Sequence, residues 1–500
     1  MYRCMTFTKK LVIVESPAKC KKIELYLGAG YKVVACFGHL REVVSLNHLD
    51  IADGFKPKYT ICDKKKALVA FLKKSIMAAN EVILATDDDR EGEAIAWHIC
   101  DLFGLSIADT KRIVFREITE EAIQRAITQP ERINMNRVFS QQARQSIDLM
   151  VGYTISPILW KNIMNTTPLS AGRCQTPTLK LVYENHLKIG VIADVKYAII
   201  GYFTNNSYAH SQPFNLNHHY DTELEVLTFL EQSRIFRHRI YSVIKKKARA
   251  PPLPLTTSRI LQASSYSTSD TMKICQGLYE EGLITYMRTD SDHYSQEFLS
   301  SAKEFICKEY STQYIGNIIS NTTPTISIIT YTSAHEAIRP TNIHCKQLSS
   351  DYGPKERNIY KIIWETTMET LLPPMEYEEQ TICIDAPFEL KYVRKMENIL
   401  FQGWYIVKNA KINAAAAAEY NYFLHLKMDN YVSYKKIIGK TVYHNTHTYL
   451  SEHDLLQQLE RHKIGRPSTY SSLIQKIQER KYVVKQTISA DAEYLSLIHI

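Results

Sequence analysis

The stretch VILATDDDREGEAIAWH, residues 82–98, combines two local patterns that together indicate the fold. Its first part, 82–86, is a short continuous apolar run, typical of a strand buried on both faces of a sheet. From residue 90 the apolar side chains take helical spacing. A second unit of this kind, LVIV at 11–14 followed by ESPAKCKKIELYLG, lies near the N-terminus. Strand-then-helix units predict a parallel sheet with covering helices.

Carboxylates follow both predicted strands: Glu15 follows the first, and Asp87, Asp89 and Glu91 follow the second. Open α/β sheets place their sites at the carboxyl ends of strands, so we expect the four to converge. Hard oxygen ligands favour Mg²⁺. The alternative is a solvated helix N-terminus, where acidic residues are favoured by the helix dipole, and for an isolated DxD it is the better interpretation. Repulsion among four carboxylates calls for a cation and favours the metal site.

Lys19 closes the SPAK segment, 16–19, directly after Glu15. A lysine there could hold a phosphate or give a proton to a leaving oxygen. Taken alone, a surface lysine is the commoner explanation.

Tyr286 stands in YEEGLITYMRTDSD, residues 279–292. A phenol with a pKa of about 10 is a weak nucleophile and needs a nearby cation. Arg288 lies two residues on, and in an extended segment the two side chains share a face. A tyrosine in LITYM is more often core than catalyst, so other basic groups must converge on it. The candidates are Arg90, Arg144, Arg173, His335, Arg339 and Arg466.

Two further segments bear on phosphate chemistry. In GRPSTYSSLIQKIQERKYV, 465–483, Ser468 and Thr469 are predicted at a helix N-cap beside Arg466. A phosphate site and a plain cap are equally good interpretations. The GKT at 439–441 ends like a P-loop, but Tyr434 stands where the first glycine belongs, so no nucleoside triphosphate is expected.

The composition sets wider limits. Five hundred residues predict three or more domains. The net charge of +9 suits a polyanionic partner. No apolar run reaches the roughly 18 residues of a membrane span, and no signal peptide is evident, so we expect a protein inside the cell. The ten cysteines include no CxxC pair, which argues against a zinc ribbon.

The predicted elements alternate along the chain. The α/β region gives way to helices from about 131 to 190, and strands begin near 193. A polar loop rich in Asn and His is expected at 205–221 and a proline-marked crossing between domains at 245–262. Helices, strands and helices then follow at 259–372, 376–445 and 451–483. A chain that re-enters the same kinds of domain indicates a closed path.

The sequence resembles the type IA DNA topoisomerases of the bacterial topoisomerase I kind. The resemblance rests on motifs in the family's order, covering about residues 11–485: LVIVESPAK, FGHLREV, FKPKY, ATDDDREGEAIAWH, VFREIT, ARQSIDLMVGY, LSAGRCQTPTL, YEEGLITYMRTDS, SAHEAIRPT and IGRPSTY. Each motif is modestly specific, and together they leave little room for coincidence.

The resemblance implies a multidomain fold: a TOPRIM Rossmann-like α/β domain, helical domains and a β-rich arch around a toroidal hole. The expected limits are 9–130 for the TOPRIM domain, 131–190 and 446–494 for the two parts of a helical DNA-binding domain, 251–374 for the helical domain with the tyrosine, and 191–250 and 375–445 for the arch. The last residues, 495–500, are interpreted as an artefact of a chain that is truncated at its C-terminus.

The resemblance also assigns roles. Tyr286 would attack one DNA strand and become joined to its 5′-phosphate, after which the other strand passes and the break is rejoined. The catalytic set is Tyr286, Arg288, Glu15, Lys19 and His335; the Mg²⁺ set is Glu15, Asp87, Asp89 and Glu91; the DNA-binding set is His39, Arg90, Arg144, Asp148, Arg173, Gln175, Arg339, Arg466, Ser468 and Thr469.

The implied function is ATP-independent relaxation of negatively supercoiled DNA by a monomer that binds single strands, no membrane and no nucleoside triphosphate. The expected place is the cytoplasm at a bacterial nucleoid, or a viral factory or nucleus for a viral or eukaryotic source. Three alternatives stay open: a topoisomerase III-like decatenase, a TOPRIM nuclease or primase-like protein, and an inactive fragment that only binds single-stranded DNA.

Overall fold

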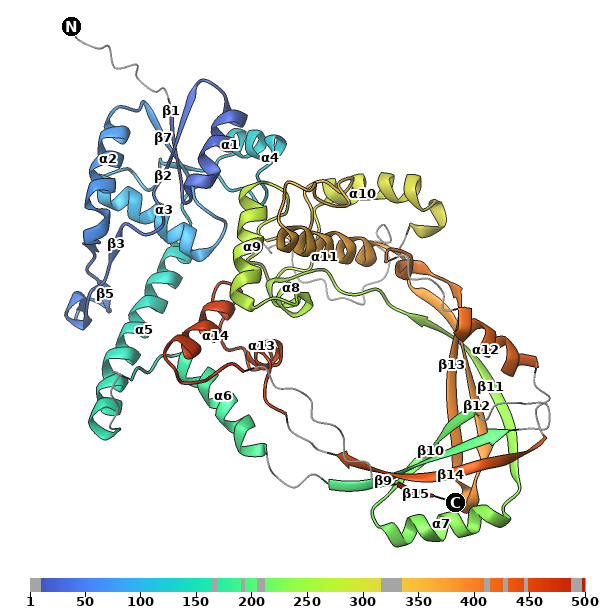
Figure 1. Cartoon of the computed structure of the whole chain (residues 1–500). Coiled ribbons are helices and arrows are strands. Elements are labelled where there is room, and N and C mark those ends of the chain that lie inside the picture. The colour runs from blue at the N-terminus through green and yellow to red at the C-terminus, as the bar shows by residue number, and fades with distance from the viewer. Residues whose placement is uncertain are drawn as a thin grey trace.

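The computed structural model describes residues 10–163, 169–189, 194–204, 212–315, 335–408, 414–425, 430–444, 448–486 and 497–499. In Figure 1 an N-terminal α/β domain stands against a body of helices, and from that body the chain traces a ring that is completed by long strands. The multidomain α/β, α and β fold predicted from the sequence is confirmed.

The α/β domain is built on a sheet of four parallel strands in the order β2-β1-β7-β8. Its principal elements are β1 (Lys10–Val14), α1 (Pro17–Leu27), β2 (Tyr31–Ala35), α2 (Lys66–Met77), β7 (Glu81–Ala85), α3 (Arg90–Phe103), β8 (Lys111–Arg112) and α4 (Glu120–Thr128). Two small antiparallel sheets lie between β2 and α2 in the chain: β3 (Arg41–Glu42) pairs with β6 (Thr60–Ile61), and β4 (Leu49–Asp50) pairs with β5 (Lys56–Pro57).

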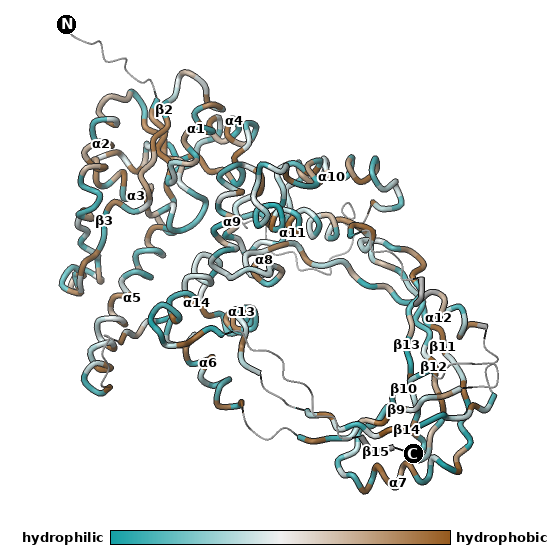
Figure 2. Tube along the Cα trace, in the orientation of Figure 1, coloured by the Kyte–Doolittle hydropathy of each residue, from teal (hydrophilic) through white to brown (hydrophobic). Residues whose placement is uncertain are grey.

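The central strands are buried on both faces because successive side chains point to opposite sides. Leu11 and Ile13 pack with residues of α2 and α3, whereas Val12 and Val14 pack with residues of α1 and α4. These strands therefore read as continuous apolar runs, and Figure 2 shows them in brown inside the domain.

The helical body comes from three separate parts of the chain. Its helices are α5 (Met135–Asn162), α6 (Gln175–Lys188), α8 (Thr257–Ala263), α9 (Thr268–Glu280), α10 (Gln296–Glu309), α11 (Pro354–Leu371), α13 (Glu452–Arg461) and α14 (Tyr470–Glu479). Leu181 and Val182 of α6 pack against a cluster from α8, α13 and α14, so the chain returns to an early helix after completing the ring.

The strand-rich part holds a seven-stranded sheet in the order β11-β12-β13-β10-β9-β14-β15, and β14 also pairs with β11. Its strands are β9 (Asp194–Thr204), β10 (Gln212–Tyr220), β11 (His238–Arg249), β12 (Met375–Asp385), β13 (Lys391–Phe401), β14 (Tyr431–His444) and β15 (Leu497–His499). Two helices pack on its core, α7 (Glu223–Ile235) and α12 (Ala414–His425). The expected strand-rich arch thus also contains helices.

Two expectations from the sequence are wrong here. The described part of the predicted polar loop, 212–220, is strand β10, because Phe214 and Leu216 alternate into the core between outward polar residues; residues 205–211 lie outside the described residues. The basic run 245–249, expected in a crossing segment, is the end of strand β11 paired along β12.

One apolar core extends from the α/β domain into the helical body and the segment that holds Tyr286. Ile118 and Ile123 of the first belong to the same cluster as Tyr279 and Ile284 of the second. In the part of the chain that the structure describes, no helix is both long and apolar enough to cross a bilayer.

Candidate active site

The acidic stretch begins where β7 ends, and its third aspartate starts helix α3. Asp89 is the N-cap of α3, and its Oδ1 accepts a hydrogen bond from the backbone N–H of Gly92 at 2.8 Å. Gly92 is required by close packing: a Cβ there would stand 2.8 Å from Glu15 Oε1 and 2.9 Å from the backbone nitrogen of Asp87. The glycine lets α3 start directly against the two neighbouring strand ends.

Glu15 and Asp87 meet at this edge, as the parallel-sheet argument predicts. Glu15 Oε1 accepts a hydrogen bond from the backbone N–H of Asp87 at 2.9 Å. Burial, and then the charges of Asp87 and Asp89, raise the pKa of Glu15 to about 8. The three carboxylates are therefore close enough to repel one another.

Lys19 is not a surface residue. Its side chain is fully buried, and its Nζ forms an ion pair with Asp87 Oδ1. The local reason is helix α1: Ser16 caps it and Pro17 begins it, which places Lys19 in its first turn, beside the end of β1. A buried cation thus lies within the carboxylate group.

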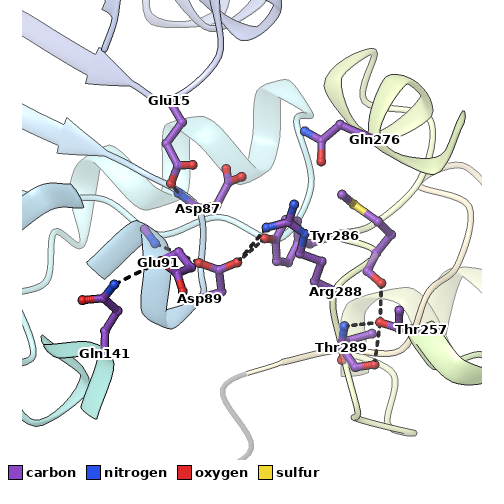
Figure 3. A network of polar contacts seen from close by, with 12 residues as sticks. Glu15, Asp87, Asp89, Glu91, Gln141, Thr257, Gln276, Tyr286, Arg288 and Thr289 are labelled. Atoms are coloured by element: carbon purple, nitrogen blue, oxygen red, sulfur yellow. Dashed lines mark hydrogen bonds and ion pairs between the residues drawn. The ribbon is translucent and has the colours of Figure 1, made fainter. Parts of the chain in front are cut away.

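Tyr286 comes from the helical body and reaches the same carboxylates. Its Oη donates a hydrogen bond to Asp89 Oδ2 at 2.6 Å, and Arg288 Nη1 lies 3.5 Å from the same oxygen. Figure 3 shows both side chains directed at Asp89, opposite Glu15 and Asp87. Burial, followed by the charge of Asp89, raises the pKa of Tyr286 well above its usual value, while Arg288 opposes that rise.

Backbone contacts hold the tyrosine segment at this place. The N–H of Tyr286 donates to the carbonyl of Arg116 at 2.8 Å, across the boundary with the α/β domain. The N–H of Thr285 donates to the carbonyl of Arg339 at 2.9 Å. On the far side, Thr257 Oγ1 donates to the carbonyl of Met287 at 2.6 Å. The nucleophile candidate is therefore held by extended backbone.

Comparisons with known proteins identify the family of this chain. Residues 132–495 match the family model described as DNA topoisomerase, and residues 10–118 match that of the Toprim domain. The chain belongs to the DNA topoisomerase family. The resemblance read from the sequence, to bacterial type IA topoisomerase I, is confirmed.

Named relatives support the assignment. DNA topoisomerase 1 of Buchnera aphidicola is 33% identical over 95% of this chain and 59% of its own length. DNA topoisomerase 1 of Rickettsia felis is 34% identical over 95% of this chain and 65% of its own length. Full-length topoisomerase I from Thermotoga maritima superposes with a TM-score of 0.79 at 30% identity, covering 95% of this chain and 79% of that one. The chain spans about six-tenths of the length of the two curated relatives.

Glu91 of this topoisomerase-family chain makes its polar contacts with residues other than the three carboxylates. Its Oε2 lies 3.1 Å from His39 Nε2 and accepts from Gln141 Nε2 at 3.3 Å, while its Oε1 accepts from Arg144 at 3.5 Å. The hydrogen bond from His39 is the main reason that the pKa of Glu91 is lowered. Figure 3 shows Gln141 reaching it from α5.

The fit to a metal ion is partial. Toprim is a metal-binding domain in this family. Glu15, Asp87 and Asp89 offer hard oxygen donors, and the pKa of Glu15 is raised first by burial and then by the charges of Asp87 and Asp89, a repulsion that a cation would relieve. Within the described ranges, however, no three Asp, Glu, His or Cys side chains are grouped closely enough to form a ready metal site. The oxygens of Asp87 and Asp89 instead face Lys19, Tyr286 and Arg288.

Asp88, between the two predicted ligands, was not singled out from the sequence. It is buried, and Arg137 Nη1 donates to its Oδ1 at 2.8 Å. Arg116 Nε and His335 Nδ1 lie 3.6 and 3.8 Å from its Oδ2. His335, predicted to support the site by hydrogen bonding, thus reaches Asp88 from the helical body.

Arg112 is a second residue that the sequence argument missed. Its side chain is buried at the edge strand β8, donates to the carbonyl of Asp87 at 2.9 Å, and lies 3.2 Å from Glu93 Oε2. Glu93 Oε1 in turn accepts from the backbone N–H of Asn134 at 2.7 Å. The sequence offered no clear signal, because the two-residue strand Lys111–Arg112 and the first turns of α3 carry other charged residues as well.

Several predicted DNA-binding residues form a chain of contacts along α5 and the start of α6. Arg144 is 3.7 Å from Asp148 Oδ2, and Arg173 Nε donates to Asp148 Oδ1 at 3.0 Å. Gln175 begins α6 and donates to the carbonyl of Ser170 at 3.2 Å. These groups continue from Glu91 away from the tyrosine. Arg90 is exposed in the first turn of α3.

Arg339 is placed differently from the other predicted DNA-binding residues. Its guanidinium is 4% exposed, makes two hydrogen bonds to Glu336 at 2.7 and 3.0 Å, and lies 3.1 Å from Glu117. It also stacks over the ring of Phe298. Buried carboxylates therefore occupy this arginine, and the structure does not bring it to the exposed arginines.

Arg466, Ser468 and Thr469 lie before α14. Thr469 is the N-cap residue, but its hydroxyl makes no capping bond; it accepts from the N–H of Arg466 at 2.9 Å and donates to the carbonyl of Arg466 at 3.0 Å. Thr469 is therefore the N-cap residue, as predicted, although its hydroxyl does not cap the helix, and Ser468 precedes it. Arg466 is exposed, and its Nη1 donates to the carbonyl of Gly465 at 2.9 Å.

Proposed function

We propose that this chain is a type IA DNA topoisomerase. It would cleave one DNA strand through a 5′-phosphotyrosine at Tyr286, allow another strand to pass, and rejoin the break, relaxing negatively supercoiled DNA without ATP. The observation that carries the proposal is the 2.6 Å hydrogen bond from Tyr286 Oη to Asp89 Oδ2, which joins a phenol from the helical body to the Toprim acids.

The cleavage step follows from the groups around the phenol. Tyr286 Oη attacks the phosphorus, the bond from phosphorus to the 3′ oxygen breaks, and the phenolic proton passes to a carboxylate, of which Asp89 is the nearest. Because the pKa of Tyr286 is raised, proton removal must accompany attack. Arg288, 3.5 Å from Asp89, is placed to stabilise the negative phosphate and the phenolate oxygen.

The leaving 3′ oxygen needs a proton, and in rejoining it must lose one. Lys19 and Glu15 are the candidates, since the lysine is buried in an ion pair with Asp87 and the glutamate has a pKa of about 8. Reversal returns the oxygen to phosphorus and releases the phenol. Bond energy is kept in the phosphotyrosine, so no nucleotide is consumed.

We propose Glu15, Asp87 and Asp89 as the residues that would hold Mg²⁺, with Glu91 further out because it faces His39. Bound there, the ion would supply positive charge to the phosphate and to the returning oxygen. The carboxylates themselves orient the tyrosine and the lysine. His335 would support the site through Asp88.

The single strand would be bound by exposed and half-buried polar groups. We propose His39, Arg90, Arg144, Asp148, Arg173, Gln175, Arg466, Ser468 and Thr469 as this set. Arg339, which was predicted among them, would act by fixing the backbone that pairs with the tyrosine segment. The domain limits predicted from the sequence, a monomeric state and a place at the nucleoid belong to the same proposal.

Strand passage requires Tyr286 to part from Asp89. The contacts to be broken include the hydrogen bond from the N–H of Tyr286 to the carbonyl of Arg116 and the apolar core shared between the domains. Such opening is a rigid movement of domains about a hinge. The segment KARAPPLPL, 247–255, whose first residues end strand β11, is the proposed hinge.

The test is covalent capture on single-stranded oligonucleotides with Mg²⁺, resolved on a denaturing gel. A 3′-labelled strand should yield a protein adduct, and a 5′-labelled strand should yield a free fragment ending in a 3′ hydroxyl. Tyr286→Phe should abolish the adduct, and Tyr360→Phe, a buried tyrosine of α11, should keep it. Strand scission without an adduct would refute the proposal in favour of a Toprim nuclease.

An inactive protein that only binds single-stranded DNA is a second candidate. It would bind the oligonucleotide in a mobility-shift assay yet form no adduct and leave supercoiled plasmid unchanged. A decatenase would separate linked circles with a single-strand gap faster than it relaxes plasmid.

A further inference from the structure

We infer that the ring of Tyr279 is a positioning element for Lys19 and Tyr286, holding the ammonium group by a cation–π contact. The inference rests on the proposed function. It adds a residue that lies seven positions before the nucleophile, at the end of helix α9.

The contacts of the ring connect the two domains. Lys19 Nζ, which belongs to α1 of the Toprim domain, lies 4.8 Å from the centre of the Tyr279 ring. The Tyr286 ring meets the same ring edge to face, with centres 5.2 Å apart and planes at 63°. One aromatic ring thus contacts both the proposed nucleophile and the lysine proposed to act on the leaving oxygen.

Burial makes the contact to the ammonium strong. Lys19 and Tyr279 are both 0% exposed. Away from water, an ammonium is attracted to the negative face of an aromatic ring more strongly than at a surface. The ion pair of Lys19 with Asp87 leaves ammonium protons that make no other side-chain hydrogen bond among the described residues, and the ring supplies them with an electron-rich surface.

The hydroxyl of Tyr279 is not what holds this arrangement. Although buried, its oxygen has no hydrogen-bond partner among the described residues. Burial first, and then the carboxylates of the acidic cluster, raise the pKa of this phenol well above its usual value, so it stays protonated. Substitutions can therefore distinguish the contribution of the Tyr279 ring from that of its hydroxyl.

The structural alternative is a tyrosine that only fills the core. Tyr279 does belong to the apolar cluster between the domains. A filler acts through its volume, whereas a cation–π partner acts through the charge distribution of its face. The two roles predict opposite results for substitutions that keep the shape of the ring and change the charge distribution of its face.

The experiment measures the single-turnover rate of adduct formation on a 3′-labelled oligonucleotide. Tyr279→Phe should support a rate within about twofold of the unsubstituted chain, because it keeps the ring. Tyr279→Leu should slow it by about 10- to 30-fold, the range expected for a desolvated cation–π contact. Tyr360→Leu, in the same apolar cluster but with its hydroxyl bonded to the carbonyl of Cys345, controls for loss of core volume.

Two measurements remain decisive if Tyr279→Leu fails to fold. Pentafluorophenylalanine at 279 keeps the size of phenylalanine but removes the negative face, so the rate should fall about tenfold relative to Tyr279→Phe. In a chain that also carries Lys19→Met, replacing phenylalanine by pentafluorophenylalanine at position 279 should change the remaining rate of adduct formation less than twofold. The inference would be overturned if phenylalanine and pentafluorophenylalanine at position 279 gave equal rates. It would also be overturned if the difference between them were as large in the Lys19→Met chain.

Failure of the inference is distinguishable from failure of the proposed function. If the unsubstituted chain forms no adduct at all, the proposed function is wrong. If it forms one and the ring substitutions leave its rate unchanged, only the role of Tyr279 is wrong.

Discussion

Replacing Gly92 with alanine should damage the acidic cluster from inside. The added Cβ would meet the backbone nitrogen of Asp87 at 2.9 Å and Glu15 Oε1 at 2.8 Å, and it would also crowd the carbonyl oxygen of Asp87. Backbone atoms cannot move aside as the end of a flexible side chain can. The start of α3 must therefore shift away from β7, carrying the N-cap Asp89 with it.

The magnitude follows from the kind of obstacle. Overpacking against fixed atoms costs typically about 1–3 kcal/mol, and contact with backbone places this variant near the upper end. Alanine gains little helix propensity in a first turn. A domain of this size loses about 2–4 °C of Tm per kcal/mol, so the first unfolding transition of the full chain should fall by roughly 6–12 °C.

The matched control is Gly277→Ala in helix α9. A Cβ at this position would meet nothing within 4 Å. The variant should therefore stabilise the chain by about 0.5–1 kcal/mol through helix propensity alone.

Calorimetry of the two variants and their rates of adduct formation provide the test. Gly92→Ala should lose adduct formation at temperatures well below its transition, because Asp89 no longer meets Tyr286. An unchanged transition together with an unchanged rate for Gly92→Ala would refute the packing argument.

Three other outcomes are expected. Burial and the charge of Arg41 lower the pKa of His98 to about 3, so the folded protein must lose stability as the pH falls below about 6.5, by about 1.4 kcal/mol per pH unit. In denaturant titrations between pH 6.5 and 5, the free energy of unfolding of His98→Gln should fall by about 2 kcal/mol less than that of the unsubstituted chain. Equal losses in the two proteins would contradict the assignment. Arg466→Ala should lower the slope of oligonucleotide affinity against salt concentration by about 0.7, measured by fluorescence titration. Arg339→Met should leave that slope unchanged and reduce the free energy of unfolding by about 3–5 kcal/mol, because two carboxylates lose their buried partner. The reverse result for the slopes would show that Arg339 is the residue that contacts phosphate. Asp87→Asn combined with Asp89→Asn should suppress plasmid relaxation more than initial cleavage, and undiminished relaxation on agarose gels would count against these residues as metal ligands.

The sequence predicts the sheet and the meeting of its strand ends because both depend on short-range patterns. The apolar runs at 11–14 and 82–86 are buried on both faces, and parallel neighbours bring Glu15 and Asp87 together. That Tyr286 faces these acids follows from no local pattern; it came from the resemblance to a family.

What the sequence leaves open depends on contacts between distant segments. Glu91 alternates with Asp87 and Asp89 along the chain, yet its Oε2 contacts His39 and Gln141 from other elements. Lys19 was expected at the surface because the SPAK segment does not indicate that Tyr279 and Asp87 bury its side chain. Strand β10 was missed because its outward side chains are those of a loop, and only Phe214 and Leu216 mark the core.

The return of the chain to helix α6 has a consequence for biosynthesis. Leu181 and Val182 of α6 pack against residues of α13 and α14, and these helices leave the ribosome more than 260 residues later. At about 5–20 residues per second, that interval is roughly 13–50 s, during which an apolar helix face lacks its cover. Nascent chains stalled between the two segments should therefore recruit chaperones at α6, and release should coincide with emergence of α14.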